Sequence, residues 1–340
     1  MEGLKTERYT ASDVAQAAAV LRRGGLLGIP TETVYGLGAN GLNEEAVHHI
    51  FEAKGRPQDN PLILHIPQAS WLERYCADIP DAAWVLAERF WPGPMTMILR
   101  RKDIVPDAVT AGLDTVGMRC PAHALCRAII AAADVPVAAP SGNTSGRPSP
   151  TNVADMLEDM DGKIDAIVDG GPCAVGVEST IIDLTAQPPR LLRPGGITLE
   201  ELREALGEVE VDPAVTRLMG KDEHPRAPGM KYRHYAPVAP VTVVRGEGAK
   251  SAAYIASHAG AESGVICFDE YAGQFGGHIV ETIGPADDKG EQARRVFDAL
   301  RRFDSTDVKE IWAQCPNEGG IGLAVNNRLN KAAGFHIIEV

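Results

Sequence analysis

The stretch AKGRPQDNPL, residues 53–62, places two cations where the backbone must turn. Lys54 and Arg56 flank a glycine at the end of a segment with helical periodicity, and Asn60 follows in a proline-braced turn. A helix C-terminus stabilises cations through its dipole, which would account for their position. An ammonium beside a forked guanidinium also supplies the donors that a polyphosphate requires. The pair therefore fits a helix end or a phosphate site, depending on what lies beside it.

Hydroxyl groups leave a buried strand in PTETVYGLG, residues 30–38, which contains Thr31, Thr33 and Tyr35. Ligands of α/β proteins bind at strand ends, so these hydroxyls are candidate contacts, although solvent-facing β-formers would give the same pattern. His65 lies inside the apolar segment LILHI. A histidine in such a place is more often part of the core than a ligand contact.

The loop APSGNTSGRPSPT, residues 139–151, follows the apolar segment VPVAAP directly. Its small residues let the backbone approach a ligand, and its N–H groups with Ser141, Asn143 and Ser149 could hold phosphate. A flexible linker is the alternative, but a linker rarely follows a buried strand so closely.

Two further arginines end short apolar segments, Arg119 in VGMRCP and Arg193 in RLLRPGG. Surface ion pairs would explain either one alone. Glu178 and Ser179 open another strand in VGVESTIIDL. The chain shows no Ser-His-Asp order, no obvious acid and base carboxylates and no catalytic cysteine context. Repeated strand-end cations and hydroxyls therefore favour a polyphosphate and a small anionic or zwitterionic substrate, with catalysis by positioning and charge neutralisation.

The glycines of residues 36–41 match GxGxxG, the dinucleotide-binding pattern. That pattern requires a strand directly before it and a helix that opens within it. Here TETVY follows the strand and the helix cap comes later, at Asn43, so we expect turn glycines. A Walker A sequence is absent.

Composition excludes some functions. The 340 residues carry a net charge of −13, which argues against a surface that binds nucleic acid throughout. The six cysteines form no CxxC pair, and CPAHALC fits no common zinc pattern, so we expect free thiols and no metal site. No apolar run approaches the length of a membrane span and the N-terminus has no signal core, so we expect a cytoplasmic protein with no membrane contact.

Strands and helices alternate along a mixed α/β chain. The patterns predict strands at 26–30, 62–66, 95–100, 135–140, 165–169, 179–184, 241–244, 264–268 and 310–315. They predict helices at 43–55, 81–90, 122–133, 151–160, 198–207, 249–259, 289–302 and 321–333. The last part of the chain is expected to form a small parallel α/β unit with crossover helices.

Between the two regions, residues 220–240 have no periodicity and contain four prolines, as a linker would. The segment MKYRHYAP is unusual for a spacer, because Lys231, Arg233 and His234 crowd around Tyr232 and Tyr235.

These motifs, in this order, resemble the YrdC-like threonylcarbamoyl-AMP synthases. PTETVYGLG, KGRPQDNPLILHI, WPGPMTMIL, VGMRCP, APSGNTSGRPSPT, GVESTIIDL and LLRPGG carry the resemblance, and APGMKYRHYAP with the C-terminal region is similar to the long form of the family. The resemblance implies a YrdC-like catalytic domain with a twisted mixed sheet and a large open cavity at residues 1–210. It also implies a linker acting as a lid at 211–239 and a small Rossmann-like parallel α/β domain at 240–340.

The implied activity converts L-threonine, bicarbonate or CO₂, and ATP to threonylcarbamoyl-AMP and diphosphate. Mg²⁺ is expected to bind through the ATP phosphates. A separate tRNA threonylcarbamoyl transferase complex is the implied consumer of the product, and tRNA is a candidate partner. The expected ATP contacts are Lys54, Arg56, Asn60, Thr115, Ser141, Asn143, Ser149, Arg193 and Tyr235, of which Lys54 and Arg56 are the catalytic candidates. The expected threonine contacts are Thr33, His65, Arg119, Ala139 and Ser179.

Two alternatives stay open at this stage. One is a YrdC-like module that binds double-stranded RNA or tRNA through a basic cavity, which the acidic net charge weakens. The other is an enzyme that forms a carbamoyl adenylate, although such proteins carry acylphosphatase and zinc-finger segments that are absent from this sequence. The C-terminal region has no clear chemistry of its own and could be a structural cap.

Overall fold

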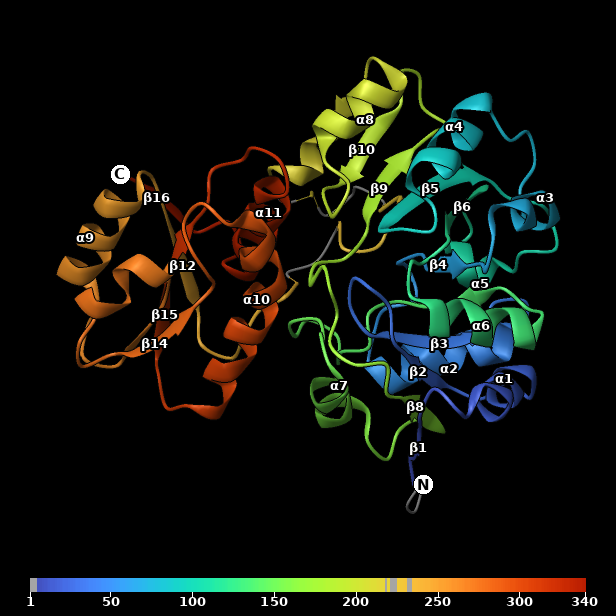
Figure 1. Ribbon diagram of the computed structural model, residues 1–340, viewed down its shortest axis with the longest axis horizontal. Helices are drawn as coiled ribbons and strands as arrows, with labels where there is room; N and C mark the ends of the chain where they lie inside the picture. The colour runs from blue at the N-terminus through green and yellow to red at the C-terminus, as the bar shows by residue number, and fades with distance from the viewer. Residues whose placement is uncertain (1–4, 218, 221–224, 231–233) are drawn as a thin grey trace.

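Two sheets organise the protein, whose computed structural model describes residues 5–217, 219–220, 225–230 and 234–340 (Figure 1). The first unit contains β1 (Glu7–Tyr9), α1 (Val14–Arg22), β2 (Leu27–Ile29), β3 (Gly36–Asn40), α2 (Glu44–Lys54), β4 (Ile63–His65), η1 (Ala69–Trp71), α3 (Leu72–Tyr75), α4 (Asp81–Phe90), β5 (Met95–Arg100), α5 (Asp107–Thr110), β6 (Thr115–Arg119), α6 (Ala124–Ala133), β7 (Val137–Ala138), α7 (Val153–Met160), β8 (Ala166–Val168), β9 (Thr180–Asp183), β10 (Arg190–Arg193), α8 (Leu199–Leu206), β11 (Glu210–Val211) and η2 (Pro213–Val215).

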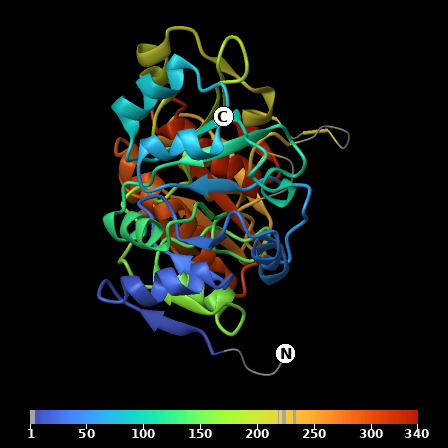
Figure 2. The ribbon, with the colours of Figure 1, turned by 90° about the vertical axis from the view of Figure 1, so that its right-hand side faces the viewer.

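The first sheet is mixed, with strand order β1-β8-β2-β3-β7-β4-β6-β5-β9-β10-β11. Parallel pairs such as β4 with β6 and β5 with β9 adjoin antiparallel pairs such as β5 with β6. The strand β1 lies at one edge, near the N-terminus (Figures 1 and 2). One apolar cluster fills this unit, from α1 through the sheet to α6 and α8. This architecture confirms the predicted mixed sheet.

Local sequence rules explain the helix that carries the two cations. Asn43 caps α2 by accepting a hydrogen bond from the Ala46 N–H. At the other end Gly55 adopts the left-handed conformation, and the N–H of Arg56 bonds the Phe51 carbonyl at 2.9 Å. This arrangement ends the helix and turns the chain at the point that the sequence predicted.

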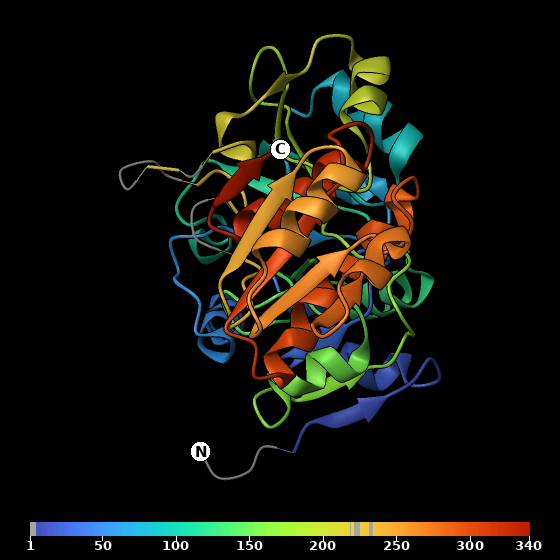
Figure 3. The same cartoon turned by 90° about the vertical axis from the view of Figure 1, so that its left-hand side faces the viewer.

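The second unit contains β12 (Val241–Arg245), α9 (Gly248–His258), β13 (Ser263–Cys267), η3 (Asp269–Gln274), β14 (Ile279–Thr282), α10 (Lys289–Arg302), η4 (Phe303–Ser305), β15 (Glu310–Cys315), α11 (Gly322–Ala332) and β16 (Ile337–Glu339). Its sheet has the order β14-β13-β15-β12-β16, and its pairs are parallel, as predicted (Figure 3). The helices α10 and α11 lie on the side of this sheet that faces the first unit, whereas α9 covers the other side (Figure 1).

One prediction was wrong. Gly36 and Gly38 do not form a turn, because Gly36–Asn40 is the strand β3, paired antiparallel with β2; Gly41 alone lies in a turn, as predicted. Glycine is required at position 38 by the close packing of the sheet, because a Cβ on Gly38 would lie 2.8 Å from the side chain of Val137 in β7. The same residues are buried and open no phosphate-binding helix.

Several short elements escaped the sequence patterns, among them β1, α1, α3, α5, β11, β14 and β16. The helix α1 is rich in alanine, and β14 is a partly exposed strand of four residues, so neither gives a strong apolar period. Among the helices of the described residues, none has both the length and the apolar character of a membrane span.

Candidate active site

A polar cavity opens between the strand ends of the first unit and the linker. It encloses about 780 Å³, including the open solvent at its mouth. Four cations, one carboxylate and several hydroxyl and amide groups contribute to its wall. The lining residues are Thr31, Thr33, Val34, Gly36, Lys54, Arg56, Pro57, Asn60, Ile63, His65, Arg119, Ala139, Pro140, Ser141, Asn143, Ser145, Gly146, Glu178, Ser179, Arg193, Pro228, Gly229, His234 and Tyr235.

The two cations of α2 lie differently within this cavity. The buried ammonium of Lys54 donates to the carbonyls of Ser141 and Asn143. Burial, reinforced by Arg56, lowers the pKa of Lys54 well below its usual range. The Arg56 guanidinium donates to the Pro61 carbonyl at 3.2 Å and keeps a pKa of about 10 after desolvation, so it is charged at neutral pH. Lys54 therefore secures the neighbouring loop, and Arg56 presents a permanent positive charge.

The loop of residues 139–151 is ordered by its own polar groups. The Ser141 hydroxyl donates to the side-chain oxygen of Asn143, whose amide donates to the carbonyls of Thr144 and Arg147 at 2.9 Å. The backbone N–H of Ser145 bonds the Lys54 carbonyl, which ties the loop to α2. The predicted flexible-linker alternative is therefore wrong for this loop, which is a fixed part of the cavity wall.

Arg193, at the end of β10, converges with Ser179 at the start of β9. The guanidinium donates to the Ser179 carbonyl at 3.0 Å and to its hydroxyl at 3.1 Å. The same hydroxyl lies 2.8 Å from that of Thr96. Burial lowers the pKa of Arg193 to about 10, which leaves the side chain charged at neutral pH. One strand-end arginine and one strand-start serine thus meet as a unit.

Arg119 forms a buried ion pair with Glu32 at 2.7 Å, and the two residues are 4% and 8% exposed. Burial opposes ionisation of Glu32, but the charge of Arg119 and its hydrogen bond lower the pKa of that carboxyl below its usual value. Among the residues that the structure describes, Arg119 Nε and Glu32 Oε2 have no hydrogen-bond partner. The pair therefore presents a fixed guanidinium to the cavity and retains unused capacity for hydrogen bonding.

His65 lies beside this pair, because β4 and β6 place it opposite Arg119. Burial, and then the charge of Arg119, lower the pKa of His65 to about 3. The imidazole is therefore neutral at physiological pH and can act in the cavity only as a neutral donor or acceptor.

The linker contributes Tyr235, whose backbone adopts the left-handed conformation with φ of 65°. Its ring packs on Phe297 of α10 with centroids 5.1 Å apart, and the Arg328 guanidinium lies 5.5 Å from its centre. Lys231, Tyr232 and Arg233, which the sequence analysis singled out, lie outside the described residues.

Most predicted site residues reach this cavity, with two exceptions. Thr115 begins β6, four residues before Arg119, and is not part of the wall. Ser149 is fully buried behind the wall, where its hydroxyl donates to Glu178. The predicted role of each as an ATP contact stays a prediction.

Two acidic residues of the site received no role from the sequence. Glu178 lines the cavity and Glu32 holds Arg119. Both stand in motifs noted above, Glu32 as the only acid of PTETVYGLG and Glu178 directly before Ser179, and that was the available signal. The described residues contain no cluster of three or more His, Cys, Asp or Glu side chains that could hold a metal ion.

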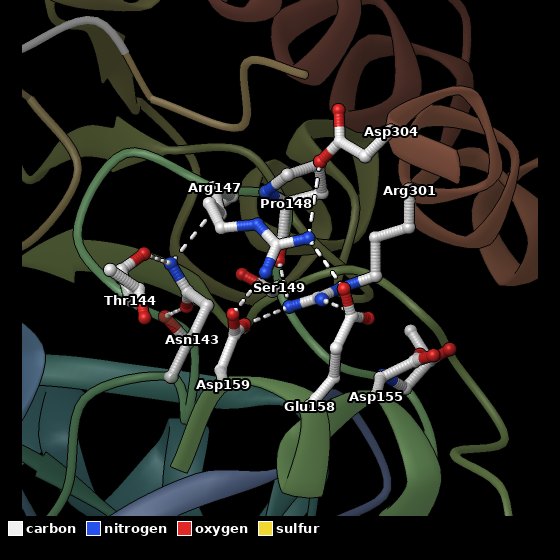
Figure 4. Close-up of polar contacts among 12 residues, drawn as sticks. Asn143, Thr144, Arg147, Pro148, Ser149, Asp155, Glu158, Asp159, Arg301 and Asp304 are labelled. Carbon is white, nitrogen blue, oxygen red and sulfur yellow. Dashed lines mark hydrogen bonds and ion pairs between the residues drawn. The ribbon is translucent and has the colours of Figure 1, made fainter. Parts of the chain in front are cut away.

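The second unit contacts the loop of residues 139–151 through a cluster of ion pairs (Figure 4). Arg147 pairs with Asp304 of η4 at 3.1 Å and also with Asp159 of α7 at 2.5 Å. Arg301 of α10 is buried against the same Asp159 and donates to the Pro148 carbonyl at 2.7 Å. The cavity wall is therefore attached to both units.

Comparisons with known proteins agree with this geometry. The profile of the Sua5/YciO/YrdC family, described as telomere recombination, matches residues 19–195, and that of the threonylcarbamoyl-AMP synthase C-terminal domain matches 197–334. The chain is 48% identical to a threonylcarbamoyl-AMP synthase of Pyrococcus abyssi, over 98% of both chains. It is 45% identical to the Bacillus subtilis enzyme of the same name, over 98% of this chain and 97% of the other.

Solved structures give the same picture. The crystal structure of P. abyssi Sua5 in complex with L-threonine superposes with a TM-score of 0.90 at 45% identity, over 98% of this chain and 99% of the other. Escherichia coli YciO, at 23% identity and a TM-score of 0.51, shares the fold over 56% of this chain and 96% of its own.

Proposed function

The chain belongs to the threonylcarbamoyl-AMP synthase family, and on that premise we infer how its cavity divides the reaction among its residues. The enzyme forms L-threonylcarbamoyladenylate and diphosphate from L-threonine, bicarbonate and ATP, for threonylcarbamoyladenosine modification of tRNA next to the anticodon. The observation that carries the assignment within the cavity is that arginines reach its wall from different elements: Arg56 and Arg193 form one group, and Arg119, held by Glu32, stands apart from them in the division that we propose.

The first group is the proposed ATP end. Arg56 and Arg193 keep their charge when buried and face the same cavity, so they suit the phosphate oxygens of a nucleotide. Asn60 adds a buried side-chain oxygen that has no partner. The ordered loop of Ser141 and Asn143 supplies backbone N–H groups and hydroxyls beside them. Thr115, Ser149 and Tyr235 are the further proposed contacts.

The second group is the proposed threonine end. Arg119 presents its guanidinium to the cavity from a fixed position, as a carboxylate ligand requires. Neutral His65 and the hydroxyls of Thr33 and Ser179 are suited to the amino and hydroxyl groups of an amino acid, and the backbone of Ala139 completes this end.

No protein nucleophile is needed for the chemistry. The threonine amine and bicarbonate form a carbamate with loss of water, and a carbamate oxygen attacks the α-phosphorus of ATP while the bond to diphosphate breaks. We propose that the protein holds these groups in line and offsets the charge on the leaving diphosphate. Arg56 is well placed for the second task. Lys54, also proposed as catalytic, contributes by holding the carbonyls of Ser141 and Asn143.

Mg²⁺ is expected in this reaction, and the cavity offers little to bind it directly. Glu178, the one carboxylate that the described residues contribute to the lining, already accepts hydrogen bonds on both oxygens. The free oxygen of Asn60 suits a hydrated magnesium ion, which keeps several of its waters. We therefore propose that Mg²⁺ arrives with the ATP phosphates, that Asn60 faces it, and that it supplies charge neutralisation.

We also propose three domains, at 1–210, 211–239 and 240–340, with the middle segment acting as a lid. In support, Pro228, Gly229, His234 and Tyr235 of this segment form part of the cavity wall. A closed cavity would protect the labile carbamate and the adenylate from water. The consumer of the product is proposed to be a tRNA threonylcarbamoyl transferase complex in the cytoplasm.

One assay tests this function. The wild-type protein is incubated with ATP, Mg²⁺ and bicarbonate, and diphosphate is measured with and without L-threonine. We expect release that depends on threonine. Diphosphate release that does not depend on threonine would refute the proposal. Salt-dependent RNA binding without threonine-dependent diphosphate release would favour the RNA-binding module.

A further inference from the structure

The helix α11 of the second unit carries two buried cations into the boundary with the first unit. Arg328 is 0% and Lys331 is 5% exposed, although both lie in a region of the helix that is otherwise packed with apolar residues and asparagines. Lys331 donates to the carbonyl of Gly229, which belongs to the linker. Burial of a guanidinium destabilises the folded state unless its N–H donors are hydrogen-bonded. The partners of Arg328 therefore indicate its role.

Those partners belong to the wall of the active-site cavity. Arg328 Nε donates to Glu178 Oε2 at 2.7 Å, and a terminal nitrogen lies 3.3 Å from the Glu178 carbonyl. The other terminal nitrogen donates to the Pro194 carbonyl at 3.0 Å. Pro194 directly follows Arg193, and Glu178 directly precedes Ser179. One side chain of the second unit therefore fixes the backbone beside two proposed substrate contacts.

The chain of contacts continues through Glu178 to the loop of residues 139–151. Glu178 Oε1 accepts a hydrogen bond from the hydroxyl of Ser149, which is fully buried. Burial would raise the pKa of Glu178, but Arg328 and then Arg193 outweigh it and keep the carboxylate ionised. An ionised carboxylate accepts at both oxygens, so Glu178 can accept from Ser149 and Arg328 at once while it is held in this orientation.

We propose that Arg328 is a positioning residue for the ATP end of the cavity, acting through Glu178 on Ser149. This inference rests on the proposed function, because it assumes that Ser149 and Arg193 serve ATP. It also assigns a task to the second unit: α11 completes a site whose lining comes from the first unit and the linker.

A purely structural role for Arg328 predicts a different result. If it only joined the two units, its loss would lower stability and the amount of active enzyme, and the KM for ATP would not change. A positioning role changes the KM for ATP more than kcat, because the misplaced groups bind the nucleotide. The effects of changes at Arg328 and Glu178 must also be coupled, since one acts through the other.

The test measures threonine-dependent diphosphate release for R328M, R328K, E178Q and the double variant R328M/E178Q, with thermal unfolding recorded for each. The control is R302M, which removes an arginine from exposed ion pairs on α10. We expect R328M and E178Q each to raise the KM for ATP about ten- to a hundredfold, the effect of losing a charge-assisted hydrogen bond. R328K should lie between R328M and the wild type.

The double variant should be no worse than the more impaired single variant. A KM for ATP of R328M within about twofold of R302M, or a double variant whose effect is the product of the two singles, would overturn the proposal. If R328M fails to fold, the KM values for ATP of R328K and E178Q test the proposal instead. Wild-type values in both variants would overturn the proposal. If the wild type itself releases no diphosphate in response to threonine, the proposed function fails instead, so the two failures are distinguishable.

Discussion

Replacing Arg119 by methionine separates the two tasks that the structure gives this side chain. Arg119 is the buried counterion of Glu32, at 2.7 Å, and it is the proposed partner of the threonine carboxylate. Methionine keeps much of the apolar stem and removes the charge. The variant should therefore lose both stability and affinity for threonine, and the two losses have different causes.

The stability loss comes from Glu32, which is only 8% exposed. Removing one partner of a buried ion pair costs about 3–5 kcal/mol in the free energy of unfolding. In the wild type the pKa of Glu32 is lowered from 4.5, so the stabilisation is present above about pH 4.5 and is lost as the pH falls through the native pKa. Without Arg119, burial raises that pKa, and R119M should be destabilised more at pH 8 than at pH 5.

The affinity loss comes from the missing guanidinium. A hydrogen bond to a charged group contributes about 1.5–3 kcal/mol, which corresponds to a rise of about ten- to a hundredfold in the KM for threonine. The KM for ATP should change much less, because the phosphates are assigned to Arg56 and Arg193 and not to Arg119.

The double variant R119M/E32Q distinguishes the two losses, because it removes both charges. Its free energy of unfolding, measured in urea at pH 5 and pH 8, should recover toward the wild type and lose the pH dependence. Its KM for threonine should stay high. If the double variant regained the wild-type KM for threonine, Arg119 would be only the counterion of Glu32, and our assignment of the threonine end would be refuted.

Three further predictions follow from the geometry. R56M should raise the KM for ATP about tenfold or more with a much smaller change for threonine, in the diphosphate assay; equal changes for both substrates would contradict the division of the cavity. The His65 imidazole, whose pKa is about 3, should stay neutral from pH 8 to pH 5 by NMR, and a titration midpoint near 6.5 would contradict its burial. G195A should lower the free energy of unfolding, measured in urea, by about 1–3 kcal/mol and should lower activity, because the added Cβ would lie 2.3 Å from the Thr180 nitrogen. The control is G273A, whose added Cβ meets no atom within 4 Å.

The sequence was most informative where a local rule acts without help from the rest of the chain. The glycine that ends α2 appears in the structure as predicted, and the helix expected at 198–207 forms as α8, which begins with a capping box of Thr198 and Glu201. The strands β12, β13 and β15 of the second unit were predictable because each is a short apolar run, whereas β14 and β16 were not predicted. The glycines of β3 were misread, because their cause is the close packing of a neighbouring strand, which local spacing does not reveal.

The same distinction holds for the site. Cations and hydroxyls at strand ends could be found from their positions, and most of them meet in one cavity. The residues that hold these cations and hydroxyls in place could not be found from the sequence. Glu32 is identified by its contact with Arg119, 87 positions away, and Arg328 by its contact with Glu178, 150 positions away. Such pairs depend on how the units pack together, and no local pattern encodes them.

The most direct test of the account is the identity of the product. The wild-type enzyme is incubated with L-threonine, ¹³C-bicarbonate, Mg²⁺ and ATP labelled at the α-phosphate, and the products are separated and identified by mass spectrometry. The account predicts one adenylate that contains threonine, the bicarbonate carbon and the α-phosphate, formed together with diphosphate and only when all three substrates are present. AMP or ADP with no such adduct, or an adenylate that lacks the bicarbonate carbon, would contradict it.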